Sequence, residues 1–64
     1  MTFFDNSIQI TASYAQKVAL ERAAWKGMDR AEVLGIWKRL GRDEDAREMI
    51  TDITDGEIEI VVEN

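Results

Sequence analysis

The sequence predicts an α+β fold, a single small domain over residues 1–64 in β-α-α-α-β order, with three short helices packed on a two-stranded terminal sheet. Two observations support this prediction. Apolar and polar residues alternate near both ends of the chain, which is typical of half-buried strands. Between them, three segments place apolar residues at helical spacing, and each begins at a helix-capping residue. A chain of 64 residues can bury one small core.

The first strand is predicted over SIQIT, residues 7–11. In an extended chain, Ile8 and Ile10 lie on one face, and the polar residues around them lie on the other. A turn or bulge is expected just before this strand, at Asp5-Asn6. The strand is therefore expected to be half-buried.

The first helix is predicted from a capping box, in which Ser13 accepts a hydrogen bond from the Gln16 amide and the Gln16 side chain reaches back. The helix should run to about Lys26 and end at Gly27. Two of its sides are apolar, one formed by Tyr14, Val18 and Trp25 and the other by Leu20, Ala23 and Ala24. Such a helix is central in a fold or contacts a second chain. Small domains also gain stability from association, so we expect a homodimer.

The second helix has the clearest beginning. Asp29 is the expected N-cap, and Met28 and Val33 are spaced as a hydrophobic staple around it. The helix should end at Gly41. The residues at core-facing helical spacing are Val33, Ile36, Trp37 and Leu40.

The segment ITDITDGEIEIVVEN, residues 50–64, admits two interpretations. Asp55-Gly56 between alternating apolar residues is a strong hairpin signal. A hairpin centred there would place Asp52 opposite Glu59, and like charges in such positions are destabilising. The hairpin is therefore the less favoured alternative.

The favoured interpretation is a third helix, a turn and a strand, with Asp43 as the N-cap of the helix. The helix is expected over 43–52, the turn over 54–56 and the strand over 57–63. This final strand should pair with the N-terminal strand. The core predicted from all these elements comprises Trp25, Val33, Ile36, Trp37, Leu40, Met49, Ile50, Ile58 and Ile60.

The composition excludes most catalytic chemistry. The chain has no His and no Cys, which removes the commonest general base, the thiolate nucleophile and nearly all zinc chemistry. A calcium loop built around Gly56 would need oxygen ligands where Thr51, Ile53 and Val62 stand. We therefore expect no enzyme, no cofactor and no metal site.

A cytoplasmic location is expected. No apolar stretch approaches the roughly 20 residues of a membrane span. The first residues, MTFFDNSIQI, lack the basic region of a signal peptide. The absence of cysteine gives no sign of an oxidising compartment. No membrane partner is therefore expected.

Charge is unevenly distributed along the chain. Residues 1–42 carry a net charge of +3 and residues 43–64 carry −8, which together give −5. The outward acids of the last helix and strand are predicted to bind a basic surface of a protein or ribonucleoprotein. These residues are Glu44, Glu48, Asp52, Glu57, Glu59 and Glu63. The alternative is that they only keep an exposed surface solvated.

The favoured function is that of a small acidic, non-enzymatic interaction protein that binds and inhibits or regulates a macromolecular partner. Small size, acidity and the lack of catalytic residues are also the profile of inhibitors carried by phages and mobile elements, such as anti-CRISPR and other anti-defence proteins. This comparison is an analogy at the level of a class.

Residues 7–40 offer an alternative. The strand SIQIT, a helix and then GMDRAEVLGIWKRL are similar to the ribbon-helix-helix pattern of small repressors and antitoxins. The resemblance implies a dimeric DNA-binding regulator whose outward strand residues reach the major groove, here Ser7, Gln9 and Thr11. The acidic C-terminal segment would then resemble the toxin-binding part of an antitoxin.

Overall fold

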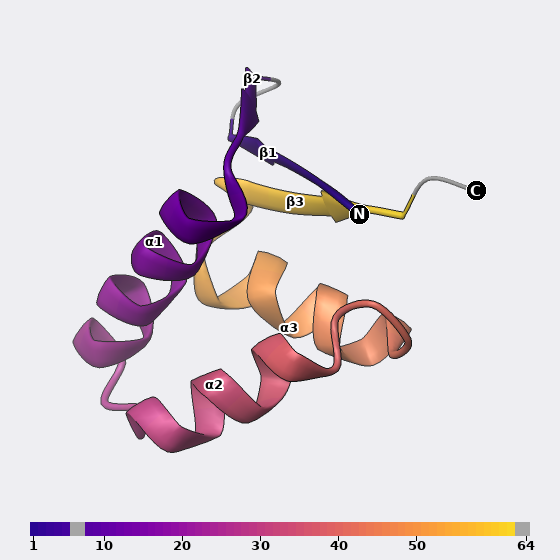
Figure 1. Ribbon diagram of the computed structural model, residues 1–64. Helices are drawn as coiled ribbons and strands as arrows, with labels where there is room; N and C mark the ends of the chain where they lie inside the picture. Colours follow the sequence, from indigo (N-terminus) through magenta and orange to yellow (C-terminus); the bar gives the residue numbers. More distant parts are fainter. Residues whose placement is uncertain (6–7, 63–64) are drawn as a thin grey trace.

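In the computed structural model, which describes residues 1–5 and 8–62, three helices lie on one side of a three-stranded antiparallel sheet (Figure 1). The predicted α+β fold is confirmed, but the sheet has a third strand because the N-terminal segment forms two. Of the turn predicted at Asp5-Asn6, Asp5 ends the first strand and Asn6 lies outside the described residues. In chain order the elements are β1 (Thr2–Asp5), β2 (Ile8–Ile10), α1 (Ala12–Trp25), α2 (Arg30–Lys38), α3 (Glu44–Ile53) and β3 (Ile58–Val61).

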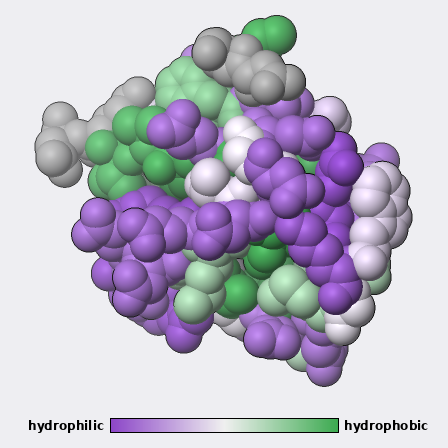
Figure 2. Space-filling view, turned by 180° about the vertical axis from the view of Figure 1, so that it is seen from behind, coloured by the Kyte–Doolittle hydropathy of each residue, from purple (hydrophilic) through white to green (hydrophobic). Residues whose placement is uncertain are grey.

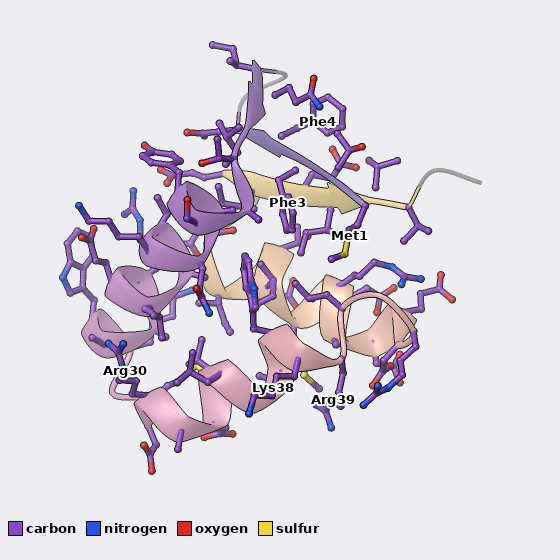
Figure 3. The ribbon with its side chains drawn as sticks, viewed as in Figure 1. Met1, Phe3, Phe4, Arg30, Lys38 and Arg39 are labelled. Atoms are coloured by element: carbon purple, nitrogen blue, oxygen red, sulfur yellow. The ribbon has the colours of Figure 1, made fainter. Side chains whose placement is uncertain are left out.

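The additional strand β1 occupies the centre of the sheet, whose order is β2-β1-β3. Phe3 pairs with Ile10 on one side and with Ile60 on the other, so β1 separates the two strands that we expected to pair. Phe3 points toward the helices and Phe4 toward the opposite face (Figure 3). This is the alternation that a strand requires. The central position of β1 therefore gives the core an aromatic side chain.

Helix α1 begins earlier than predicted. Its N-cap is Thr11, whose Oγ1 accepts a hydrogen bond from the Tyr14 amide at 3.3 Å. The capping box predicted at Ser13 is wrong, because β2 ends at Ile10 and the chain turns directly into the helix. The C-terminal end is as predicted, with Gly27 in the left-handed region at a φ of 77°.

The N-caps predicted for the other two helices are confirmed. Asp29 Oδ1 accepts a hydrogen bond from the Ala31 amide at 3.0 Å. Asp43 Oδ1 accepts one from the Asp45 amide at 3.0 Å. In each case the carboxylate satisfies a backbone N–H that has no partner within the helix.

Helix α3 continues into a turn and a strand, which confirms the favoured interpretation and excludes the hairpin. Asp55 and Gly56 adopt φ values of 54° and 82°, and they reverse the chain after the helix. Strand β3 then pairs with β1, and Ile58 lies opposite Asp5. The left-handed dipeptide that resembles a hairpin signal here joins a helix to a strand.

Most of the predicted core is buried. Six of the nine predicted residues have little exposed surface, namely Val33, Ile36, Leu40, Ile50, Ile58 and Ile60. Trp37 is half-buried and packs against this cluster, and its ring stacks on Phe3 with 5.4 Å between centroids. The stack joins α2 to the central strand of the sheet.

Two core predictions are wrong. Trp25 is 74% exposed and Met49 is 42% exposed. Helix α1 instead buries the small side chains Ala15, Ala19 and Ala23, which follow one another at four-residue spacing. Small residues let the backbone of α1 lie close to its neighbours. Val18 and Leu20 are partly buried against the core, whereas Tyr14 and Trp25 are exposed.

Candidate functional site

One face of α3 and strand β3 border a groove of about 430 Å³ that is lined mainly by charged side chains. Glu44, Glu48 and Asp52 follow one another at four-residue spacing, so they share a face of α3. We call this site the acidic groove and define it by all the residues that line it, Glu44, Arg47, Glu48, Thr51, Asp52, Glu59 and Ile60.

The acidic groove carries an excess of negative charge. Among the described residues, the ion pairs are Arg22–Glu57, Lys26–Asp55 and Arg39–Asp43, and none includes a carboxylate of the groove. The cation in the groove is Arg47, whose Nη1 donates a hydrogen bond to the Leu40 carbonyl at 2.8 Å. Its guanidinium is therefore anchored to the chain just after α2.

Thr54 fixes the junction between α3 and β3, and with it the two walls of the acidic groove. Its side chain is fully buried. Thr54 Oγ1 donates to the Ile50 carbonyl at 2.9 Å and accepts from the Ile58 amide at 3.1 Å. One hydroxyl thus links the last turn of the helix to the first residue of the strand.

The structure distributes the predicted partner-binding residues over different places. Glu44, Glu48, Asp52 and Glu59 line the acidic groove. Glu57 instead contacts α1, where it accepts a hydrogen bond from Arg22 at 2.6 Å. Arg22 also lies over the ring of Trp25, 4.9 Å from its centroid. Glu63 lies outside the described residues.

Two residues of the acidic groove were missed in the sequence, although a signal for them exists. Arg47 and Thr51 are each three residues after one of the predicted acids, so helical spacing alone puts them on the same side of α3. Ile60 was expected in the core, where it is buried with 8% of its surface exposed, and it also lines the groove.

A second contact ties the end of α1 to the turn after α3. Lys26 Nζ lies 2.8 Å from Asp55 Oδ1 and 3.0 Å from the Asp52 carbonyl oxygen. The hydrogen bond from this ammonium, together with its charge, lowers the pKa of Asp55 below the ordinary value of 3.8. The carboxylate of Asp55 is solvent-exposed, and neither Asp55 nor Lys26 lines the acidic groove, so this contact positions the turn beside the groove.

The Lys26→Met variant should raise the pKa of Asp55 back toward 3.8, because it removes the two largest causes of the shift and leaves only the smaller effect of the Arg22 charge. The wild-type pair stabilises the fold at pH values above the unfolded-state pKa of Asp55. That contribution is lost as the pH falls through the lower folded-state pKa. Titration of the Asp55 side-chain carboxyl carbon by NMR measures the folded-state pKa in each of the two proteins. Identical pKa values in the wild type and the variant would contradict the role of Lys26 in lowering the pKa of Asp55.

The residues of the DNA-binding alternative do not form a basic surface. Gln9 is exposed in β2, Thr11 caps α1, and Ser7 lies outside the described residues. The basic residues Arg30 and Lys38 belong to α2 and Arg39 is its C-cap, and all three lie at the opposite end of the molecule from the sheet (Figure 3). The structure therefore does not bring these two sets together.

The face of the molecule drawn in Figure 2 is mostly hydrophilic, with smaller hydrophobic areas between the polar side chains. Within residues 1–5 and 8–62, no group of three or more acidic side chains is placed to hold a metal ion. No helix in this part of the chain is long and apolar enough to cross a membrane. Comparison with protein-family models, curated proteins and solved structures found no match to this chain.

Proposed function

We propose that this protein is a small, non-enzymatic interaction protein that binds a basic surface of a protein or ribonucleoprotein through the acidic groove. Binding would inhibit or regulate that partner, as phage-encoded anti-defence proteins of the anti-CRISPR type do, and it would take place in the cytoplasm. The observation that supports the proposal is the set of four carboxylates that line one groove without an ion pair among the described residues.

The charges of α3 have a cost in the free protein. Glu44 and Glu48 are four residues apart, as are Glu48 and Asp52, and each like-charge contact destabilises a helix by about 0.2–0.5 kcal/mol. Cations of a partner would offset this repulsion. Charges of one sign around a concave surface also raise the rate of encounter with a partner of opposite sign.

The test uses the double variant Glu48→Gln, Asp52→Asn and a control, Glu21→Gln, Glu32→Gln, which removes the same charge from α1 and α2. A partner captured from the source cell is purified, and its association rate with each protein is measured against ionic strength. We expect association about tenfold slower for the groove variant at low salt, within the range of electrostatic steering. The control should resemble the wild type.

The free energy of unfolding of each variant separates an effect on binding from an effect on folding in this experiment. The groove variant should fold normally and gain about 0.2–0.5 kcal/mol for each repulsive contact that it loses. Equal association rates at every salt concentration would leave only a solvated acidic face. A salt-sensitive shift of random duplex DNA by the wild type, with no protein partner captured, would support the DNA-binding alternative instead.

Self-association through the apolar side of α1 is a separate expectation. Tyr14 and Trp25 are 48% and 74% exposed on this helix, and Ile8 in the neighbouring strand is 69% exposed. Ile8 and Tyr14 also line the same shallow hollow. We expect a homodimer in sedimentation equilibrium at high micromolar concentration, and the Ile8→Thr, Tyr14→Ser variant should be monomeric. A wild-type protein that remains monomeric would contradict the expectation.

A further inference from the structure

Among the residues that the structure describes, strand β3 is paired along one edge only, and its other edge lies along the acidic groove. In the sheet order β2-β1-β3, β3 pairs with β1 on one side only. Glu59 and Ile60 of β3 line the groove together with α3. A strand edge offers unpaired backbone donors and acceptors, which an extended segment of another chain can satisfy.

The direction of the backbone groups follows from the contact with Thr54. The Ile58 amide donates to Thr54 Oγ1 at 3.1 Å, so the backbone groups of Ile58 point away from β1. In an antiparallel ladder, successive residues direct their N–H and C=O groups to opposite sides. Those of Glu59 and Val61 therefore face β1, and those of Ile60 point away from β1, toward the free edge.

The spacing of the acids on α3 fits an extended partner. Residues four apart on a helix are about 6 Å apart along its axis. Alternate residues of a strand are about 6.6 Å apart. Cations at every second position of an extended segment would therefore stay within reach of Glu44, Glu48 and Asp52 in turn. A helical partner would meet these acids but leave the edge of β3 unpaired.

We propose that the segment bound in the acidic groove is an extended, lysine- or arginine-rich strand that adds to the free edge of β3. This inference rests on the proposed function and deepens it. The added strand accepts a hydrogen bond from the Ile60 amide and donates one to the Ile60 carbonyl oxygen. Its side chains on one face contact Glu44, Glu48 and Asp52, and those on the other face lie on the side of Glu59.

The probe is a short peptide of alternating lysine and threonine, acetylated and amidated, that covers the length of the acidic groove. Two further versions are methylated on backbone amide nitrogens. One version carries the methyl group on the amide of every lysine, and the other on the amide of every threonine. Only one of these sets of amides can face β3, so one version should lose binding and the other should keep it. The groove variant Glu48→Gln, Asp52→Asn should weaken binding of the parent peptide about tenfold.

Amide hydrogen exchange locates the bound segment. At saturation with the parent peptide, the Ile60 amide should exchange at least about tenfold more slowly, because it gains an acceptor. The amides of Glu59 and Val61, which already face β1, and that of Ile58, which is bonded to Thr54, should change little. This alternating pattern is the signature of an added strand.

The outcomes distinguish the two proposals. Binding that depends on the groove acids, but leaves Ile60 exchange unchanged or tolerates both methylated peptides, would overturn the strand addition and leave the proposed function standing. Binding that is equal in the groove variant and the Glu21→Gln, Glu32→Gln control would overturn both. A complete lack of binding of the parent peptide to the wild type at low salt would also overturn both proposals. The acids beside the edge strand would then serve only to prevent its pairing with another chain.

Discussion

The Trp37→Ala variant is expected to lose about 3–5 kcal/mol of the free energy of unfolding, the range for removing a large aromatic side chain from a core. Trp37 is half-buried, packs on the core and stacks almost parallel on Phe3, with an interplanar angle of 6°. The stack is the aromatic link between α2 and the central strand. Stabilities of about 0.05–0.15 kcal/mol per residue are typical, so this loss could unfold so small a domain.

Trp25→Ala is the matched control for this prediction. Trp25 is 74% exposed and contacts the guanidinium of Arg22. An exposed cation–π contact contributes only about 0.5–1 kcal/mol, so the variant should remain close to the wild type. Urea unfolding followed by circular dichroism avoids any dependence on tryptophan fluorescence. Equal losses in the two variants would contradict the assignment of Trp37 to the core.

The Thr54→Val variant is expected to lose about 1–3 kcal/mol, the cost of leaving a buried polar group without a hydrogen bond. Valine has nearly the same shape but no hydroxyl. It would leave the Ile58 amide without the acceptor that Thr54 Oγ1 provides at 3.1 Å. Because this hydroxyl joins α3 to β3, the loss should be accompanied by faster exchange of the Ile58 amide.

Thr51→Val is the control on the same helix. Thr51 Oγ1 donates to the Arg47 carbonyl at 3.2 Å, and Thr51 is only half-buried. Water can replace this hydrogen bond, so the free energy of unfolding should change by about 0.5 kcal/mol or less. If Thr54→Val unfolds at the same urea concentration as Thr51→Val, and Ile58 exchange is unchanged, the proposed role of the Thr54 hydroxyl is wrong.

The sequence by itself was sufficient for features that depend on neighbours a few residues away. Asp29 and Asp43 cap their helices, and Gly27 ends α1 with a positive φ, because each contact closes within one helical turn. The common face of Glu44 and Asp52 follows from helical spacing in the same way. For this reason the helices and one wall of the acidic groove were predictable.

The sheet was not predictable to the same degree, because strand pairing joins residues that are far apart in the chain. Strand β1 has only four residues, and its central place comes from the contact of Phe3 with Ile60 and with Trp37. None of these partners is near it in sequence. The choice of Thr11 over Ser13 as the cap of α1 likewise depends on where β2 ends.

Tertiary packing also decided which of several acceptable faces was buried. Two sides of α1 are apolar in the sequence, but the helix buries Ala15, Ala19 and Ala23, whose small side chains allow close packing, and Trp25 lies off that face and is exposed. Tertiary contacts also gave the acids of the C-terminal segment different surroundings. Glu57 precedes β3 and pairs with Arg22, while Glu59 lies within the strand and joins the acids of α3. The sequence placed the charges and the turn at Asp55-Gly56 in this segment. The pairing of β3 with β1 decided which of the acids share a groove, because it joins residues far apart in the chain.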